Sequence, residues 1–173
     1  MAFVNYPRQE IPLPAKGSFI ALSLFMALLL NLVPLKGIGL SLWPDFLALV
    51  VLYWCINQPQ RAGISMAFGM GLLMDIGEAS ALGQHALAYS IMAFAALMFQ
   101  RRLSVFGLLN QAPQIGLILL TGQLVILLAG LLTGSHFPGW NFFLISVIGM
   151  LLWPVVSSLL RLPQRPRSDS DAG

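Results

Sequence analysis

Residues 63–76 read GISMAFGMGLLMDI, and this stretch decides how many times the chain crosses a membrane. As a helix its 14 residues would be about 21 Å long at 1.5 Å per residue, which is short for a hydrocarbon core of about 30 Å. The stretch is nevertheless apolar almost throughout, and its one charged residue, Asp75, lies near its end. With this segment counted as a crossing, the sequence predicts six spans.

The composition of the whole chain calls for lipid rather than water around such segments. The 173 residues are 58% hydrophobic and 9% charged, and the mean hydropathy is +0.84. A soluble domain carries about 25% charged residues, so this chain has too few polar groups to cover a water-facing surface. We predict an integral membrane protein, built as an all-α bundle.

Apolar segments on both sides of residues 63–76 complete the predicted bundle. The sequence predicts membrane-spanning helices at residues 18–35, 44–58, 63–76, 82–100, 108–134 and 140–162. Together they form one transmembrane domain, residues 18–162, between a cytoplasmic tail of residues 1–17 and a disordered cytoplasmic tail of residues 163–173. Pro44 suits the first turn of a helix, and Pro154 predicts a kink.

The basic residues orient the bundle. Six spans place on one side the following lysines and arginines: Arg8, Lys16, Arg61, Arg101, Arg102, Arg161, Arg165 and Arg167. The other side receives Lys36 alone. Because lysine and arginine near span ends mark the cytoplasm, both termini are predicted to be cytoplasmic. The same explanation accounts for the net charge of +3, so we expect no nucleic-acid partner.

A stripe of small residues lies on the third predicted helix. Gly63, Ala67 and Gly71 repeat every four residues, and Asp75 is the next residue on that face. Small residues at this spacing let helices approach closely in lipid. The stripe therefore either packs within the bundle, leaving Asp75 wetted at the helix end, or receives the transmembrane helix of a partner. In the second case Asp75 is a polar anchor for a partner or ligand. A carboxylate at membrane depth keeps the second interpretation open.

Asp45 and His85 are the other candidate functional positions, together with Asp75. Asp45 either stabilises the start of its helix, by about 0.3–1 kcal/mol, or binds a ligand. His85 opens the fourth helix, where pairing with Asp75 or Glu78 is expected on the outer side.

Polar residues also mark the fifth predicted helix. Asn110, Gln114 and Thr121 share one of its faces, with Gln111 close by. We expect this stripe to look into the bundle because amides need hydrogen-bond partners.

No pattern predicts catalysis, so we expect a non-enzyme without catalytic residues, cofactor or metal. Cys55 is the single cysteine, which excludes an intrachain disulfide. Ser65 and His85 are the one nucleophile–base pair that a hydrolase could use, and no motif supports them. Asp45 and Asp75 form at most an isolated pair of acids.

Five motifs follow one another in a distinctive order. They are WPDFLAL at residues 43–49, YW at 53–54, PQRAG at 59–63, GLLMD at 71–75 and LGQHALAY at 82–89. In this order they resemble the MreD family of bacterial rod shape-determining proteins. The likeness is densest over residues 43–102 and, with length and topology, covers nearly the whole chain.

The resemblance implies a non-catalytic component of the cell-elongation complex, the elongasome, in the bacterial inner (cytoplasmic) membrane. That component would be required for rod shape and for organising peptidoglycan synthesis. It implies MreC as the first partner, with MreB, RodA and a penicillin-binding transpeptidase reached through the complex. It also implies a six-helix bundle similar to the substrate-binding subunits of energy-coupling-factor transporters.

In the docking hypothesis MreC packs on the small-residue stripe, Asp75 and His85 hold contacts outside the membrane, and the basic loops lie near anionic membrane lipids. The alternative is a substrate-binding subunit of a small-molecule membrane transporter. Its pocket would open outward and be lined by Asp45, Asp75, His85 and polar groups of the fifth helix.

Overall fold

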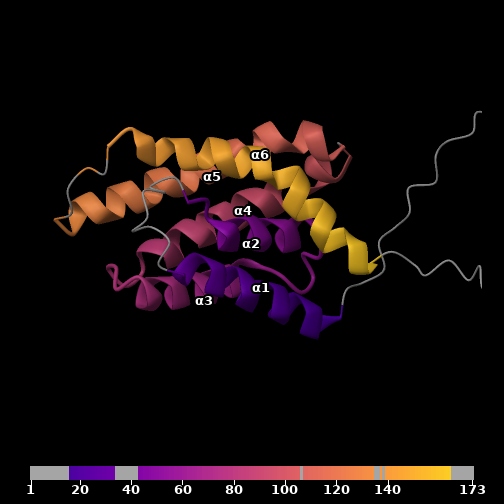
Figure 1. Ribbon diagram of the computed structural model, residues 1–173, viewed down its shortest axis with the longest axis horizontal. Coiled ribbons are helices and arrows are strands. Elements are labelled where there is room, and N and C mark those ends of the chain that lie inside the picture. Colours follow the sequence, from indigo (N-terminus) through magenta and orange to yellow (C-terminus); the bar gives the residue numbers. More distant parts are fainter. Residues whose placement is uncertain (1–15, 34–42, 106, 135–136, 138, 165–173) are drawn as a thin grey trace, which may run out of the picture.

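Six long helices and one short 3-10 helix account for most of the residues that the structure describes. The computed structural model describes residues 16–33, 43–105, 107–134, 137 and 139–164. Its helices are α1 (Gly17–Leu32), α2 (Phe46–Asn57), α3 (Ile64–Gly77), α4 (Gln84–Val105), α5 (Leu108–Leu132), α6 (Asn141–Arg161) and the short 3-10 helix η2 (Leu162–Gln164). These residues contain no strand, so the prediction of an all-helical chain is confirmed. Successive long helices run in opposite directions (Figure 1).

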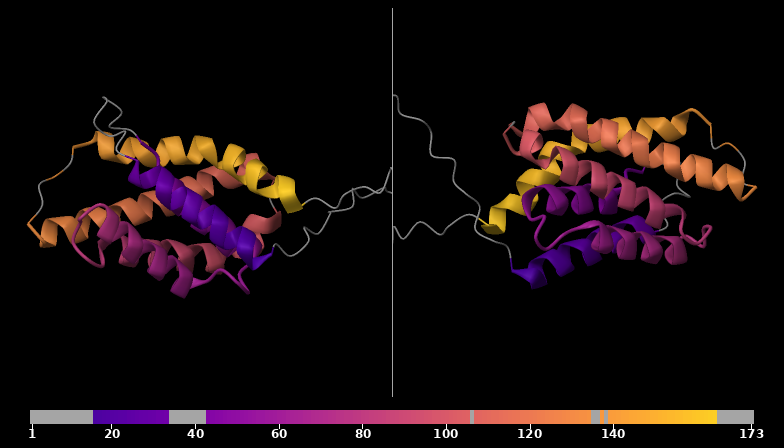
Figure 2. Two further views of the ribbon diagram at one scale, coloured as in Figure 1. Left: turned by 60° about the horizontal axis from the view of Figure 1, so that its bottom comes forward. Right: turned by 180° about the vertical axis from the view of Figure 1, so that it is seen from behind.

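The helices lie in three layers, with α1 and α3 on one side, α2 and α4 in the middle, and α5 and α6 on the other (Figures 1 and 2). The middle helix α2 contacts α1, α4 and α6. All of its residues from Leu47 to Ile56 are buried. Neighbouring helices therefore cover α2, which has 12 residues and is about 18 Å long at 1.5 Å per residue.

Local chemistry sets the ends of α2. The Asp45 carboxylate accepts a hydrogen bond from the Ala48 N–H at 2.9 Å and so caps the helix, which begins at Phe46. The helix predicted to begin at Pro44 therefore begins two residues later. Gln58 closes α2 just before Pro59, as expected because a proline disfavours helical backbone in the residue that precedes it.

Glycines bring the layers close together. A methyl group added to Gly71 in α3 would meet backbone atoms of Ala86 in α4, and one added to Gly149 in α6 would lie 2.7 Å from the Leu119 side chain in α5. The backbone contact leaves no room for a side chain at Gly71, whereas at Gly149 the Leu119 side chain would have to shift. The predicted kink of α6 is visible in Figure 1, where the helix bends in the half that contains Pro154.

The surface of the bundle is unusually apolar. Among its half- or more-exposed side chains are Leu22, Phe25 and Met26 of α1, Leu117 and Leu128 of α5, and Leu151, Val155 and Leu159 of α6. By length and composition, Leu108–Leu132 and Asn141–Gln164 can each cross a membrane, whereas α1, α2 and α3 are shorter apolar helices. An outward apolar face on the flanking helices is the kind of surface that a helix bundle presents to lipid.

The charged residues are separated between the two ends of the bundle. Lys16, Arg61, Arg101, Arg102 and Arg161 lie toward the end where α1 begins and α6 ends. Asp45, Asp75 and Glu78 lie at the opposite end, which we call the acidic end. The four remaining basic residues, Arg8, Lys36, Arg165 and Arg167, lie outside the described residues.

The start of the predicted disordered tail needs a correction. Pro163 and Gln164 belong to η2, and the Gln164 side chain is buried. Its amide donates hydrogen bonds to the Leu160 carbonyl at 2.8 Å and to the Tyr53 hydroxyl at 3.2 Å. These contacts hold the chain against α2 two residues beyond the predicted end of the bundle, and the rest of the tail lies outside the described residues.

Candidate functional site

Asp75 lies at the acidic end and has no exposed surface. Its carboxylate accepts backbone hydrogen bonds from Gly83 and His85, both at 2.8 Å, and from Ala86 at 3.4 Å. It also accepts the Ser80 hydroxyl at 3.1 Å, and it lies 2.9 Å from Nδ1 of His85. An anion at these N–H groups satisfies donors that a helix start leaves unpaired. Asp75 therefore caps α4 from the end of α3.

The turn that carries these donors has a backbone that favours glycine at one position. Gly83 has a φ of +97°, in the left-handed region that side chains with a Cβ rarely adopt. This conformation places the Gly83 N–H 2.8 Å from the Asp75 carboxylate. The motif around residues 82–85 thus folds back onto α3.

His85 links the buried carboxylate to the outer surface. One ring nitrogen, Nδ1, faces Asp75, and the other, Nε2, lies 3.7 Å from the Glu78 carboxylate. The expected pairing partners of His85 are both beside it. Asp75, however, has no exposed surface, so the prediction of a wetted carboxylate is wrong, and a partner or ligand cannot reach it as a polar anchor. The physical reason is the cap, which consumes both carboxylate oxygens.

The small-residue stripe packs against another helix of the same bundle. Ala67 and Gly71 are buried, and Gly71 lies directly against the backbone of Ala86 in α4. Gly63, in contrast to Gly71, has open space where a side chain would begin. The interpretation of Ala67 and Gly71 as a face for a partner helix is therefore wrong, because α4 already fills that face.

Asp45 forms a second carboxylate centre that joins three helices. Besides capping α2, it accepts hydrogen bonds from the Asn31 amide of α1 at 2.7 Å and from the Tyr89 hydroxyl of α4 at 2.7 Å. The Asn31 side-chain oxygen in turn accepts the Phe46 N–H at 3.1 Å. Asp45 thus acts at its helix start, as one interpretation predicted, and also fixes α1 and α4 to that point.

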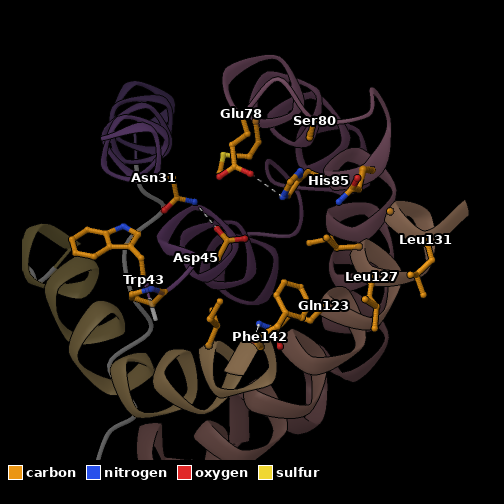
Figure 3. Close-up of a pocket in the computed structure, with 16 residues that line it drawn as sticks. Asn31, Trp43, Asp45, Glu78, Ser80, His85, Gln123, Leu127, Leu131 and Phe142 are labelled. Carbon is orange, nitrogen blue, oxygen red and sulfur yellow. Dashed lines mark hydrogen bonds and ion pairs between the residues drawn. The ribbon is translucent and has the colours of Figure 1, made fainter. Parts of the chain in front are cut away.

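A cavity of about 520 Å³ opens between these two centres and the ends of α5 and α6. Figure 3 shows Asp45, Glu78 and His85 along one side of it and Gln123 and Phe142 along another. The remaining lining residues are Asn31, Trp43, Pro44, Met74, Ser80, Gln84, Ile126, Leu127, Gly130, Leu131 and Ile145. Asp75 is not among them, because it lies behind His85. The volume falls within the range of about 300–1,000 Å³ found for small-molecule sites.

The polar groups of α5 differ from those expected. Asn110 and Thr121 are exposed, and Thr121 donates to the Leu117 carbonyl of its own helix at 3.0 Å. That internal bond removes the need to face the bundle, so the predicted inward stripe is wrong for Asn110 and Thr121, whereas Gln111, predicted close to it, is buried. The inward amides are Gln111 and Gln123, both buried.

These two glutamines connect neighbouring helices. Gln111 donates to the Leu103 carbonyl of α4 at 2.7 Å and accepts the Trp153 indole N–H of α6 at 3.2 Å. Gln123 donates to the Phe142 carbonyl at 3.0 Å and accepts the Ser146 hydroxyl. Each amide therefore ties α5 to α6 at a different depth.

Distance rules out Ser65 and His85 as a nucleophile–base pair. Ser65 is exposed in the first turn of α3, ten residues before Asp75, which corresponds to about 15 Å along a helix. The His85 ring is held beside Asp75. The histidine is too far from the serine for proton transfer, directly or through one water.

Comparison with known proteins gives one consistent family. Residues 16–162 match the family model for rod shape-determining protein MreD. The rod shape-determining protein MreD of Haemophilus influenzae is 32% identical over 148 residues, which cover 85% of this chain and 91% of that protein. No solved structure matches the chain. The matched region includes all six long helices and both carboxylate centres.

Proposed function

The chain belongs to the MreD family of rod shape-determining proteins, and on that premise we propose that it is a non-catalytic, multi-pass inner-membrane scaffold that docks MreC and so organises peptidoglycan synthesis. The observation that carries the proposal is the family match along the entire described bundle. The polar side chains at Asp45, Asp75, Gln111 and Gln123 support it, because they bond one helix to another. A scaffold needs such rigidity.

We place all six helices across the membrane, with both termini in the cytoplasm, as in the substrate-binding subunits of energy-coupling-factor transporters. The separation of basic and acidic residues between the two ends supports this orientation, since positive charge is retained on the cytoplasmic side. The acidic end with its cavity would then face outward, where the non-cytoplasmic part of MreC could reach Glu78 and His85. The basic end would face the cytoplasm.

Labelling of single cysteines tests this topology. In a background in which the buried Cys55 is replaced by alanine, we expect Leu82→Cys, 74% exposed at the acidic end, to react in intact spheroplasts with a membrane-impermeant maleimide. Arg61→Cys and Arg102→Cys should react only after the membrane is opened, because they lie at the basic end. Labelling of either arginine position from outside would overturn the proposed orientation.

Photo-crosslinking tests the docking of MreC. Since α4 covers Ala67 and Gly71, the partner helix must use another apolar face, and a photoreactive residue at Phe25 of α1, Phe68 of α3 and Leu151 of α6 samples three of them. We expect MreC to be captured strongly from one of these faces and weakly from the others, which act as internal controls. Equal or absent capture from all three, with the proteins folded and co-expressed, would count against helix docking.

The second candidate function is a small-molecule binding subunit, and the outward cavity is the observation that favours it. Two carboxylates, several amides, His85 and Ser80 line the cavity together with apolar side chains, as in many ligand sites. A metabolite released on denaturing the purified protein, and lost in a Gln123→Leu variant, would support this function. Recovery of lipid and detergent alone would leave the scaffold as the better account.

A further inference from the structure

A second concavity lies at the basic end, between the C-terminal part of α4 and the first half of α5. It encloses about 680 Å³ and is lined by Phe99, Arg101, Arg102, Leu103, Gln114, Leu117 and Ile118. We call it the basic groove. It is far from the acidic-end cavity, because α4 and α5 cross the bundle between the two (Figure 1).

The basic groove combines two chemistries in one place. Arg101 and Arg102 are exposed, and the Gln114 amide beside them is half-buried. Phe99 and Leu117, 47% and 66% exposed, extend the groove with apolar surface. Guanidinium groups bind phosphate oxygens through paired hydrogen bonds, whereas the apolar wall suits a hydrocarbon chain.

We propose that the basic groove binds one anionic phospholipid of the cytoplasmic leaflet. Its phosphate lies at Arg101 and Arg102, within reach of the Gln114 amide, and one acyl chain follows Phe99 and Leu117. This inference rests on the membrane orientation proposed above, which puts the arginines at the level of the headgroups. Charge complementarity selects an anionic lipid, and the exposed apolar wall selects a lipid over a soluble phosphate compound.

A bound lipid would stabilise the join between α4 and α5. The arginines belong to α4, while Gln114 and Leu117 belong to α5. Inside the bundle, the hydrogen bond from the Gln111 amide to the Leu103 carbonyl holds the same two helices together. Leu103 itself also lines the groove. A bound lipid would therefore stabilise the contact between α4 and α5 on the outer surface, while Gln111 stabilises it in the core.

Native mass spectrometry of the full-length protein in detergent tests this proposal, with phosphatidylglycerol and phosphatidylethanolamine as probes. We expect the wild-type protein to retain one phosphatidylglycerol in preference to phosphatidylethanolamine. The double variant Arg101→Gln/Arg102→Gln should weaken phosphatidylglycerol retention by about 30-fold, since two cationic contacts are lost. The matched control Arg61→Gln removes an exposed arginine from the same end of the bundle but outside the groove, and should retain the lipid.

Two further measurements keep the outcome decisive if the double variant folds poorly. Retention by the wild-type protein should fall as salt rises, because headgroup binding is electrostatic. Glycerol 3-phosphate, which has the charge without the chains, should not displace the lipid. Equal retention in the double variant, an equal loss in Arg61→Gln, or displacement by glycerol 3-phosphate would overturn the proposal. The cysteine labelling measures only the orientation of the protein in the membrane. A failure of the proposed topology can therefore be distinguished from a failure of lipid binding.

Discussion

Replacing Asp75 with alanine is expected to loosen the α3–α4 pair and abolish support of rod shape. The substitution removes the acceptor for backbone N–H groups of Gly83, His85 and Ala86 and for the Ser80 hydroxyl. A buried donor left without a partner costs about 1–3 kcal/mol, so losing several together is expected to cost about 4 kcal/mol. That is a large part of a folding free energy of about 5–15 kcal/mol.

The measurement is the melting temperature of the purified protein in detergent, alongside complementation in cells that lack the family member. A loss of about 4 kcal/mol corresponds to a decrease of about 8–16 °C for a domain of this size. Asp75→Asn should lie between wild type and alanine, because it keeps one acceptor oxygen but turns an NH₂ group toward the donors. Glu78→Gln, which changes a partly exposed carboxylate at the rim, is the control and should melt close to wild type. Wild-type stability of Asp75→Ala would show that the cap is unimportant.

The sequence was sufficient to predict the helices, because long apolar segments and their polar breaks are local features. The helices that begin after Asp45 and end after Asp75 were placed within about two residues of where the structure has them, whereas α4 continues to Val105, so Arg102 lies in the helix and not in the predicted loop. The position of α2 at the centre could not be predicted in the same way. Residues 47–56 are apolar on every side, so no periodicity distinguishes a helix surrounded by protein from one that faces lipid.

The roles of the polar residues were harder to predict, since they depend on which helices meet. Asp75 was recognised as important, but the donors that bury it come from residues 80–86, and their approach depends on a turn through Gly83. On α5, the spacing of the amides predicted that Gln114 faces the interior of the bundle, whereas in the structure Gln123 does. A threonine or glutamine carries the same sequence signal whether it bonds its own helix or a neighbour.

Gly71→Ala is expected to cause the second large effect, and Gly69→Ala, two residues earlier on the same helix, should cause almost none. A methyl group on Gly71 would meet Ala86 Cα, lie 2.6 Å from the Ala86 nitrogen and 2.7 Å from the His85 carbonyl carbon. These are backbone atoms that no rotamer change can move, so α3 and α4 must separate. Overpacking of this kind costs about 1–3 kcal/mol, and separation also draws Asp75 away from the donors of its cap.

Gly69→Ala is the matched control, because it makes the same change in intrinsic helix propensity as Gly71→Ala. A methyl group on Gly69 meets no atom within 4 Å, and alanine is favoured over glycine in a helix by about 1 kcal/mol. Gly69→Ala should therefore melt at or slightly above the wild-type temperature, while Gly71→Ala melts well below it. Because the clash is with the backbone of residue 86 and not with its methyl group, adding Ala86→Gly should not restore the stability of Gly71→Ala. Restoration by that second change, or equal melting of the two glycine variants, would mean that α3 and α4 do not pack as closely as described here.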